Sequence, residues 1–538
     1  RFYKSLSFGT GGMRGRTIGK IVTQEEKGKS SEKETPKHAA IGTNALNEIT
    51  IVKATKALFK YVEEWLSING EFEQPRLVVA HDVRHFSPEF SKLVAITWEK
   101  LGGYAMIFDG PRSTPQLSYT VRDRQAHTGV VITASHNPYH DNGFKAYFND
   151  GGQLVPPHAQ KVVEYFNDFN LEEIVELLNT DRDLGEPKLL GKEDDLSYAA
   201  VLEDAVLSPN LLSEQSVKLV FSPIHGTGGI STIPALLDHG VDVVTVKSQN
   251  QFDPNFSSVK SPNPENKEAL SLSIDEAKRT KSDAVLASDP DCDRLGASAA
   301  IDGVSGSLWK AFTGNQLGAL LTDWVLNKRR DQEKLRSADT VVTTLVTSGL
   351  IRCIGEKYGV NVIDWLQVGF KWIGRTIDDI GAENFVFGCE ESHGYLAGTH
   401  VRDKDASVAA LLLAELAADL KSHGKTLHQK LDEIFCAHGC HLERQVAIKL
   451  PGAAGMDQMR EIMAGLRADL PAEFGGLPVR RARDYGQLKF LESGGRETPF
   501  EGEQGDLVIF DLIDPDCPSN PGSEHDFPPL RNAIAARP

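Results

Sequence analysis

The chain has 538 residues and a mass of 58.9 kDa, which at about 100–200 residues per domain indicates several domains rather than one. Its formal net charge is −17, so neither nucleic acid nor an anionic membrane surface is expected as the main partner. The 6 cysteines are too few for a disulfide framework, and no run of about 18 apolar residues could span a membrane. We therefore expect a cytoplasmic protein.

Along the chain, short β-branched runs alternate with longer segments of helical periodicity. Strands are predicted at residues 77–80, 104–108, 129–133, 218–221, 242–246, 284–287, 341–345 and 384–387. The helix predicted at 52–68 carries one apolar stripe, and the helix predicted at 405–421 is rich in Ala and Leu. This alternation is typical of parallel α/β layers, with ligand sites at the carboxyl ends of the strands.

Polar loops follow three of these strands directly, at 133–138, 288–294 and 388–392. Since each loop comes from a separate α/β segment, we expect three similar domains that face one central cleft. The predicted boundaries of the α/β domains are 1–205, 206–308 and 309–435.

The remaining residues, 436–538, show a different pattern and are predicted to form a smaller α+β domain. Its expected elements are a strand at 446–449, a helix at 456–468 and a strand at 507–511. Residues 514–530 are rich in Pro, Asp and Ser and are expected to be loop. The polar segment at 20–40 is expected to be an exposed excursion.

The first polar loop reads Thr-Ala-Ser-His-Asn-Pro at 133–138. A serine on a tight turn at a strand end is exposed for attack or for phosphorylation, with His136 as a proton acceptor and Lys145 as a cation. Pro138 and Gly143 are expected to fix the turns of this loop. A polar turn without chemistry explains the same residues equally well.

The second loop reads Asp-Pro-Asp-Cys-Asp-Arg at 289–294. On an extended loop Asp289, Asp291 and Asp293 would point the same way, because side chains alternate. Three adjacent negative charges favour a bound cation, and a set of oxygen ligands suits Mg²⁺. An EF-hand is excluded because Arg294 stands where that loop needs glycine. The alternative is an acidic, solvated turn.

A third motif, Gly-Thr-Gly-Gly-Met-Arg-Gly at 9–15, is weaker on its own. Its glycines would let backbone amides approach an anion, and Arg14 adds positive charge. It is neither a P-loop nor a dinucleotide fingerprint, because Gly-Lys-Ser/Thr is absent and no strand precedes it in the chain.

A fourth motif combines Glu-Glu-Ser-His-Gly at 390–394 with Arg-Asp-Lys-Asp at 402–405. A carboxylate beside a hydroxyl can hold adjacent sugar hydroxyls, and Lys404 could bind phosphate or move a proton. A helix-capping acidic loop before the helix at 405–421 explains this motif equally well.

Together, and in this order, the four loops resemble the α-D-phosphohexomutase superfamily, which includes phosphoglucomutases, phosphomannomutases and relatives that act on phosphopentoses. The resemblance runs from Gly9 to about Asp405, and the pairing of the loops at 133–138 and 289–294 is highly specific. The stretch Val-Gly-Phe-Lys-Trp-Ile-Gly at 368–374 looks most like the bacterial phosphoglucomutase branch.

The resemblance implies three similar α/β domains with mixed or parallel sheets around a central cleft, followed by a C-terminal α+β domain. It implies that Ser135 is the phosphoserine, and that a phosphoserine oxygen holds one Mg²⁺ together with Asp289, Asp291 and Asp293. It also implies the residues around the reacting group, which are Arg14, His136, Lys145 and, as an acid/base candidate, Lys404.

The resemblance further implies a set of substrate contacts. These are Glu390 and Ser392 on the sugar hydroxyls, Gly369 and Lys371 in the loop that reads sugar orientation, and Arg294. Two departures from the family pattern stand out. Val368 replaces the threonine of many relatives, and the loop that grips the non-reacting phosphate would begin at Arg537. Either the chain is truncated there or the protein lacks this phosphate clamp, so the C-terminal domain is expected to be incomplete at its end.

The activity implied is interconversion of a hexose 1-phosphate and a hexose 6-phosphate, with glucose as the first choice of sugar. It would run through a phosphoserine and a bound 1,6-bisphosphate, with glucose 1,6-bisphosphate as activator and a monomer or homodimer as the working unit. The alternatives are a phosphomannomutase, a phosphopentomutase, or a phosphatase or sugar-bisphosphate synthase on the same cleft.

Overall fold

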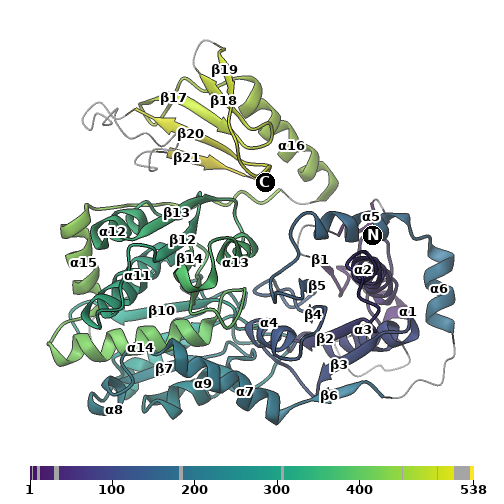
Figure 1. Cartoon of the computed structure of the whole chain (residues 1–538), viewed down its shortest axis with the longest axis horizontal. Coiled ribbons are helices and arrows are strands. Elements are labelled where there is room, and N and C mark those ends of the chain that lie inside the picture. The colour runs from purple at the N-terminus through teal and green to yellow at the C-terminus, as the bar shows by residue number, and fades with distance from the viewer. Residues whose placement is uncertain are drawn as a thin grey trace.

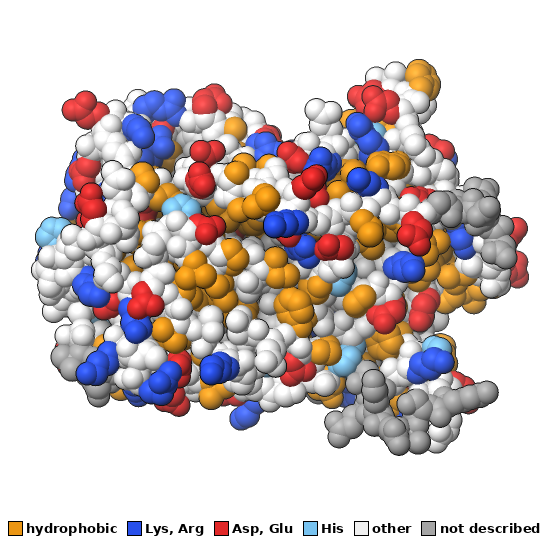
Figure 2. Space-filling view, turned by 90° about the horizontal axis from the view of Figure 1, so that it is seen from below, with side chains coloured by type: hydrophobic (Ala, Val, Ile, Leu, Met, Phe, Trp, Pro, Cys, Tyr) orange, Lys and Arg blue, Asp and Glu red, His pale blue; other side chains and the backbone are white. Residues whose placement is uncertain are grey.

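The computed structural model describes residues 1–2, 4–8, 12–28, 36–180, 186–303, 308–450, 452–492, 495–513 and 533–537. Three α/β units lie together, and a smaller fourth unit sits above them in the view of Figure 1. Within the described residues, no helix is both long enough and apolar enough to cross a membrane. Acidic and basic side chains are interspersed on the face shown in Figure 2.

The first unit is built on a six-stranded mixed sheet in the order β1-β5-β4-β2-β3-β6. Its strands are β1 (Gly12–Arg16), β2 (Arg76–His81), β3 (Tyr104–Phe108), β4 (Thr128–Ile132), β5 (Asp141–Phe148) and β6 (Lys188–Leu190). The pairs among β2, β3, β4 and β6 are parallel, whereas β5 runs antiparallel to β4 and to β1. Its helices are α1 (Gln24–Lys27), α2 (Glu48–Ile68), α3 (Ser87–Lys100), α4 (Thr114–Asp123), α5 (His158–Asp168), α6 (Leu171–Asn179) and α7 (Lys192–Leu202).

The second unit repeats this plan with five strands in the order β11-β10-β9-β7-β8. The strands are β7 (Lys218–Ser222), β8 (Asp242–Thr245), β9 (Ala284–Ser288), β10 (Leu295–Ala300) and β11 (Trp309–Ala311). Parallel pairing joins β7 to β8 and β9, and β10 is an antiparallel addition. Its helices are α8 (Leu211–Glu214), α9 (Gly228–Asp238) and α10 (Ser271–Thr280).

The third unit has four strands in the order β13-β12-β14-β15. They are β12 (Thr340–Thr344), β13 (Asn361–Leu366), β14 (Phe385–Glu390) and β15 (Gly394–Ala397), with β15 again antiparallel. The accompanying helices are α11 (Gly314–Asp331), α12 (Leu350–Tyr358), α13 (Phe370–Asp379), α14 (Ala406–Ser422) and α15 (Leu427–His438). A parallel core of three or four strands with an antiparallel neighbour thus recurs in all three units, which confirms the predicted architecture.

Helix α14 joins the second and third units. Almost every residue of α14 is buried, and its leucines share one apolar core with Phe221 of β7 and Phe387 of β14. The helix begins at the N-cap residue Asp405, whose carboxylate accepts the backbone N–H groups of Ser407 at 2.8 Å and Val408 at 3.3 Å. This cap also fixes the chain that immediately precedes it, where the Arg-Asp-Lys-Asp motif lies.

The fourth unit is an antiparallel sheet covered by one helix. Its elements are α16 (Gly452–Ala468), β16 (Glu473–Phe474), β17 (Leu477–Asp484), β18 (Lys489–Glu492), β19 (Glu497–Pro499), β20 (Val508–Leu512) and β21 (Ala533–Ala536). It contacts the third unit through Gln367, whose side-chain amide donates to the carbonyl of Glu503 at 2.9 Å.

Two local predictions were wrong, and one expected segment lies outside the described residues. No strand forms at 446–449, where Val446 is 71% exposed and Ile448 is 76% exposed, because an apolar run is not a strand without a partner to bond its backbone. Residues 29–35 of the segment at 20–40 lie outside the described residues, and its described part is not merely exposed, since Glu26 is buried and ion-paired with Arg1. The loop expected at 514–530 falls in the undescribed part.

Hydrogen bonds connect the three α/β units with one another. The backbone N–H of the first residue of α4 donates to the Asp291 carbonyl at 2.9 Å, which joins the first unit to the second. Leu295 N–H donates to the His393 carbonyl at 3.0 Å, which joins the second to the third. The Tyr147 hydroxyl donates to the Asp403 carboxylate at 2.7 Å and links the first unit to the third.

Gly226 packs directly against the acidic loop at Pro290. A Cβ on Gly226 would lie 2.3 Å from the Cα of Pro290, so the loops cannot both keep their places. We expect Gly226→Ala to lower the free energy of unfolding by about 1–3 kcal/mol, measured by chemical denaturation. Gly229→Ala is the matched control: its Cβ would meet side-chain atoms alone, of Asn250 at 3.2 Å and of Pro223 at 3.9 Å. Equal stabilities of the two variants would contradict the prediction.

Candidate functional site

Ser135 lies just beyond the end of β4, in the turn that the sequence predicted. The residue is buried and adopts a left-handed backbone conformation with φ of 54°. Its Oγ donates to Oδ2 of Asp289 at 2.8 Å and lies 3.1 Å from Nδ1 of His136. The serine hydroxyl of the first unit is therefore in direct contact with the acidic loop of the second unit.

The acidic loop follows β9 and brings its three carboxylates together. One ligand oxygen from each of Asp289, Asp291 and Asp293 lies within 4.8 Å of the others, and all three residues are buried. The loop is a tight turn and not the extended segment that was expected. The backbone N–H groups of Asp293 and Arg294 both donate to Oδ1 of Asp289 at 3.1 Å, and Cys292 is left-handed with φ of 56°.

Two lysines from other units compensate this negative charge. Lys145 lies on β5, with its Nζ 2.6 Å from Asp291 and 3.0 Å from Asp293, and the Nζ of Lys404 lies 2.9 Å from Asp293. Burial alone would lower the pKa of Lys145, but the adjacent carboxylates outweigh it and raise that pKa. The same balance raises the pKa of Lys404.

His136 behaves differently from the two lysines. Burial lowers the pKa of its imidazole well below the ordinary value, and the nearby guanidinium of Arg294 lowers it further. Among His136, Lys145 and Lys404, only His136 therefore has a lowered pKa, whereas the two lysines are held as cations in this structure.

The carboxylate oxygens of this loop fit a divalent cation. The Oδ1 atoms of Asp291 and Asp293 are buried without a hydrogen-bond partner, although buried oxygens are nearly always satisfied. Oδ2 of Asp291, in contrast, accepts from Lys145 and from the Thr114 hydroxyl at 2.7 Å. Unsatisfied oxygens in an all-carboxylate set are the ligands that Mg²⁺ prefers.

The third unit contributes a loop with a buried carboxylate. Glu390 is the last residue of β14, and its Oε1 accepts the backbone N–H of Gly369 at 2.9 Å. Burial raises the pKa of Glu390 to about 7. Gly369 has φ of 121°, a conformation that favours glycine, and two residues later burial lowers the pKa of Lys371 to about 8. Ser392 is half-buried in the turn after β14.

Three predicted arginines lie around this centre. Arg294 is ion-paired with Glu265, and a guanidinium nitrogen of Arg537 lies 3.4 Å from Oε1 of Glu391. Arg537 follows β21 directly, so this contact links the fourth unit to the loop after β14 in the third unit. Arg14 lies on β1 with an exposed side chain. Among the described contacts, neither Arg14 nor Ser392 makes a hydrogen bond to the acidic loop.

Gly143 has a different role from the turn that was expected. It lies inside β5, where a Cβ would come within 2.3 Å of the Thr133 carbonyl. Its lack of a side chain lets β5 pass close to the chain that leads into the Ser135 turn.

Sequence reasoning missed two residues that contact the site. Thr114 donates its hydroxyl to Asp291, and Arg84 donates to backbone carbonyls of the Ser135 turn. Each has a local signal: Thr114 follows the helix N-cap Ser113 and precedes a proline, and Arg84 lies three residues after β2 ends. The strand-end rule applied to β2 would have found Arg84.

Comparison with known proteins shows the family to which the chain belongs. Three family models match, described as Phosphoglucomutase/phosphomannomutase alpha/beta/alpha domain I at residues 35–172, domain II at 197–300 and domain III at 313–437. The phosphoglucomutase of Staphylococcus haemolyticus (strain JCSC1435) is 32% identical over 492 residues, which cover 91% of this chain and 82% of that protein. The phosphoglucomutase of Staphylococcus aureus (strain MRSA252) is 31% identical, covering 90% and 81%.

Solved structures share the fold. A putative phosphomannomutase from Thermus thermophilus superimposes with a TM-score of 0.65 at 22% identity, covering 95% of this chain and 93% of its own. A phosphoglucomutase/phosphomannomutase family protein from Burkholderia thailandensis gives 0.60 at 17% identity, covering 95% and 90%. From three matching domain models and more than 30% identity over nine-tenths of its length, the chain belongs to the phosphoglucomutase/phosphomannomutase family of the α-D-phosphohexomutase superfamily, whose enzymes are isomerases that transfer a phosphoryl group within their substrate.

Proposed function

We propose that the protein interconverts glucose 1-phosphate and glucose 6-phosphate through a phosphorylated Ser135. The observation that carries this proposal is the 2.8 Å contact between the Ser135 hydroxyl and Asp289, inside a site that also holds two lysines. Glucose is favoured over mannose or ribose because the two Staphylococcus proteins compared above, at 32% and 31% identity, are named phosphoglucomutases.

The proposed reaction moves one phosphoryl group in each half. The phosphoryl group of phospho-Ser135 passes to the free hydroxyl of the sugar phosphate, so the bond from phosphorus to Oγ breaks while a bond to the sugar oxygen forms. The hydroxyl proton goes to a base, for which His136, Lys145 and Lys404 are the candidates. The resulting 1,6-bisphosphate rotates within the site. The bond between its other phosphorus and the sugar oxygen then breaks as a bond from that phosphorus to Oγ of Ser135 forms, and the sugar oxygen takes the proton back from the base.

Asp289, Asp291, Asp293 and an oxygen of phosphorylated Ser135 would hold one Mg²⁺. When bound, this ion neutralises charge on the transferring phosphoryl group. The chain itself supplies further positive charge, since Lys145 and Lys404 come from two different units and converge on Asp293.

Substrate binding is proposed to fall to the third unit and the surrounding arginines. Glu390 would accept hydrogen bonds from sugar hydroxyls, and Ser392 would donate to them or accept from them. Lys371, in the loop that begins at Gly369, would contact a phosphate group of the substrate. Arg14, Arg294 and Arg537 are proposed phosphate contacts. We propose domain limits of 1–205, 206–308 and 309–435. The first domain then carries Ser135, the second carries the three aspartates, and the third carries Glu390. Glucose 1,6-bisphosphate is the proposed activator because it would phosphorylate Ser135.

The role of Ser135 is tested by Ser135→Ala. With glucose 1,6-bisphosphate supplied, turnover of glucose 1-phosphate in a coupled assay is expected to fall by roughly three orders of magnitude, because no phosphoryl acceptor remains. The thermal midpoint should stay close to that of Ser91→Ala, a control at a buried helix serine. Mannose 1-phosphate and ribose 1-phosphate, assayed alongside, define the sugar. Near-normal turnover in Ser135→Ala would refute the phosphoserine.

The metal assignment is tested by Asp291→Asn, which removes one of the two buried carboxylate oxygens of the acidic loop that have no hydrogen-bond partner. Mg²⁺ should raise the thermal midpoint of the unmodified protein, because ligands that bind the folded state stabilise it. In Asp291→Asn the concentration needed for this shift should rise at least about tenfold. Asp484→Asn, at another buried aspartate, should keep the normal response. An unchanged Mg²⁺ titration in Asp291→Asn would remove the assignment.

The pKa of Glu390 predicts a pH dependence. Burial raises this pKa to about 7, with Glu391 raising it and Lys404 and Arg294 opposing the rise, so the carboxylate that can accept sugar hydroxyls exists mainly above pH 7. The ratio of kcat/KM between the unmodified protein and Glu390→Gln should therefore increase by roughly tenfold from pH 6 to pH 8. Taking the ratio cancels titration of the substrate phosphate. A ratio that does not change with pH would contradict this role.

A further inference from the structure

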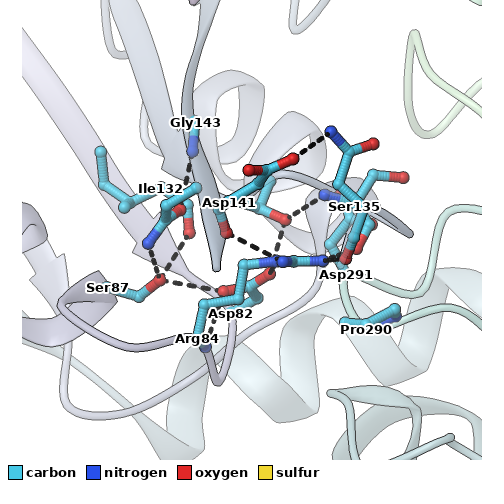
Figure 3. A network of polar contacts seen from close by, with 12 residues as sticks. Asp82, Arg84, Ser87, Ile132, Ser135, Asp141, Gly143, Pro290 and Asp291 are labelled. Carbon is cyan, nitrogen blue, oxygen red and sulfur yellow. Dashed lines mark hydrogen bonds and ion pairs between the residues drawn. The ribbon is translucent and has the colours of Figure 1, made fainter. Parts of the chain in front are cut away.

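Arg84 lies directly behind the Ser135 turn and is almost completely buried. Figure 3 shows its guanidinium reaching across from the chain after β2 into the turn after β4. One terminal nitrogen donates to the carbonyls of Pro138 and Asp141, both at 2.9 Å. The other donates to the carbonyls of Ser135 and Asn137. Four backbone carbonyls of a single turn thus converge on one side chain.

The fifth N–H of the guanidinium is also used. Nε donates to Oδ2 of Asp82 at 3.0 Å, so every N–H that an arginine side chain offers has an acceptor here. A lysine has three donors and no planar fork, so it could not serve these five acceptors at once. The site is therefore shaped for arginine in particular, beyond the need for a positive charge beside Asp82.

Asp82 connects the same cluster to the other side of Ser135. Its Oδ2 accepts the Thr133 hydroxyl at 2.7 Å, and the Thr133 oxygen in turn accepts the backbone N–H of Ser135 at 2.8 Å. The backbone N–H of Ser135 is thus held through Thr133, and its carbonyl is held by Arg84. Both sets of contacts lead to the buried ion pair between Arg84 and Asp82.

This arrangement fixes the torsion that aims the serine hydroxyl. The left-handed φ of 54° at Ser135 is unfavourable for a residue with a Cβ, so it persists only where neighbours hold both flanking peptide groups. The same torsion directs Oγ toward Asp289. Arg84 makes no contact with Oγ itself among the described hydrogen bonds, so any effect on the hydroxyl must pass through the backbone.

Arg84, Asp82 and Thr133 together form a clamp around Ser135, and Arg84 also contacts the second unit. The guanidinium of Arg84 lies 5.0 Å from the centre of the Phe256 ring, within the range of a cation–π contact. On either side, His85 meets the side chain of Asn255 at 2.8 Å, and the Ser261 hydroxyl donates to the His136 carbonyl at 3.0 Å. The segment around Phe256 therefore packs over the clamp from the unit that carries the aspartates.

We propose that Arg84 is a positioning residue for phosphoryl transfer: with Asp82 and Thr133 it locks Ser135 in the left-handed conformation that presents Oγ to the acidic loop. This inference rests on the proposed function of Ser135. It differs from a purely structural role, which would affect stability but not the rate of reaction of the folded protein.

The test compares Arg84→Lys with Arg329→Lys in the full chain. Both substitutions keep a cation beside a buried aspartate, but Arg329 pairs with Asp339, a partner in the third unit that does not contact Ser135. Dephosphorylated protein is mixed with glucose 1,6-bisphosphate and Mg²⁺, and phosphoryl gain on Ser135 is followed by intact mass. Steady-state kcat, KM for glucose 1-phosphate and the thermal midpoint are measured in parallel.

For Arg84→Lys we expect the rate of phosphoryl gain and kcat to fall about 10- to 100-fold, as for a misplaced reacting group, with KM within about threefold of the original. Arg329→Lys should lose stability but not rate. If the unmodified protein gains no phosphoryl group, the proposed function itself fails. If it does, and Arg84→Lys gains the group at the same rate, or Arg329→Lys slows equally, the positioning role is refuted.

A second variant decides the matter if Arg84→Lys does not fold. Thr133→Val is nearly isosteric and removes only the hydroxyl that links Ser135 to Asp82. It should lower the rate of phosphoryl gain in the same direction, with KM unchanged. An unchanged rate in this variant would refute the clamp.

Discussion

Compensation of charge at a buried acidic loop is the interaction on which the rest of the structure depends. Asp289, Asp291 and Asp293 place three carboxylates together where water is excluded, which is unfavourable without opposite charges. Those charges come from elsewhere in the chain, because Lys145 belongs to the first unit and Lys404 to the third. Within the second unit Arg294 lies 3.9 Å from Asp293 but also pairs with Glu265, so the closest compensating charges come from the other two units.

Backbone strain gathers at the same place. Each α/β unit has a left-handed residue in the loop it delivers, namely Ser135, Cys292 and His393, with φ of 54°, 56° and 64°. Hydrogen bonds hold such conformations, both within a loop, where Cys292 N–H donates to the Asp289 carbonyl at 3.0 Å, and between units, where His393 Nδ1 lies 3.1 Å from the Leu295 carbonyl. Strain of this kind is common at functional sites, where geometry is fixed before a ligand arrives.

The strand predictions were confirmed where a buried apolar segment pairs with a neighbouring strand. They were wrong where, among the described residues, no strand lies beside the segment. The strand expected at 384–387 exists as β14 but extends to Glu390, so this carboxylate ends a strand instead of lying free in a loop. The strand expected at 446–449 is absent, because nothing in the described structure pairs with it. The end of β2 is a local signal that points to Arg84, but the sequence does not show that five acceptors from residues 82–141 converge on its side chain in the folded chain.

The sequence by itself determined the chemistry: the serine at one strand end, the three aspartates at another and the Glu-containing loop at a third, in an order that indicates a phosphohexomutase. Local periodicity and residue type carry that information, because strand ends and turn residues are set by neighbours in the chain. Only the tertiary structure decided which groups meet. It paired Lys145 and Lys404 with the aspartates, turned the acidic loop back on itself, and placed Arg84 behind Ser135. These contacts join residues far apart in the chain, and their energies depend on burial and distance, which sequence spacing does not encode.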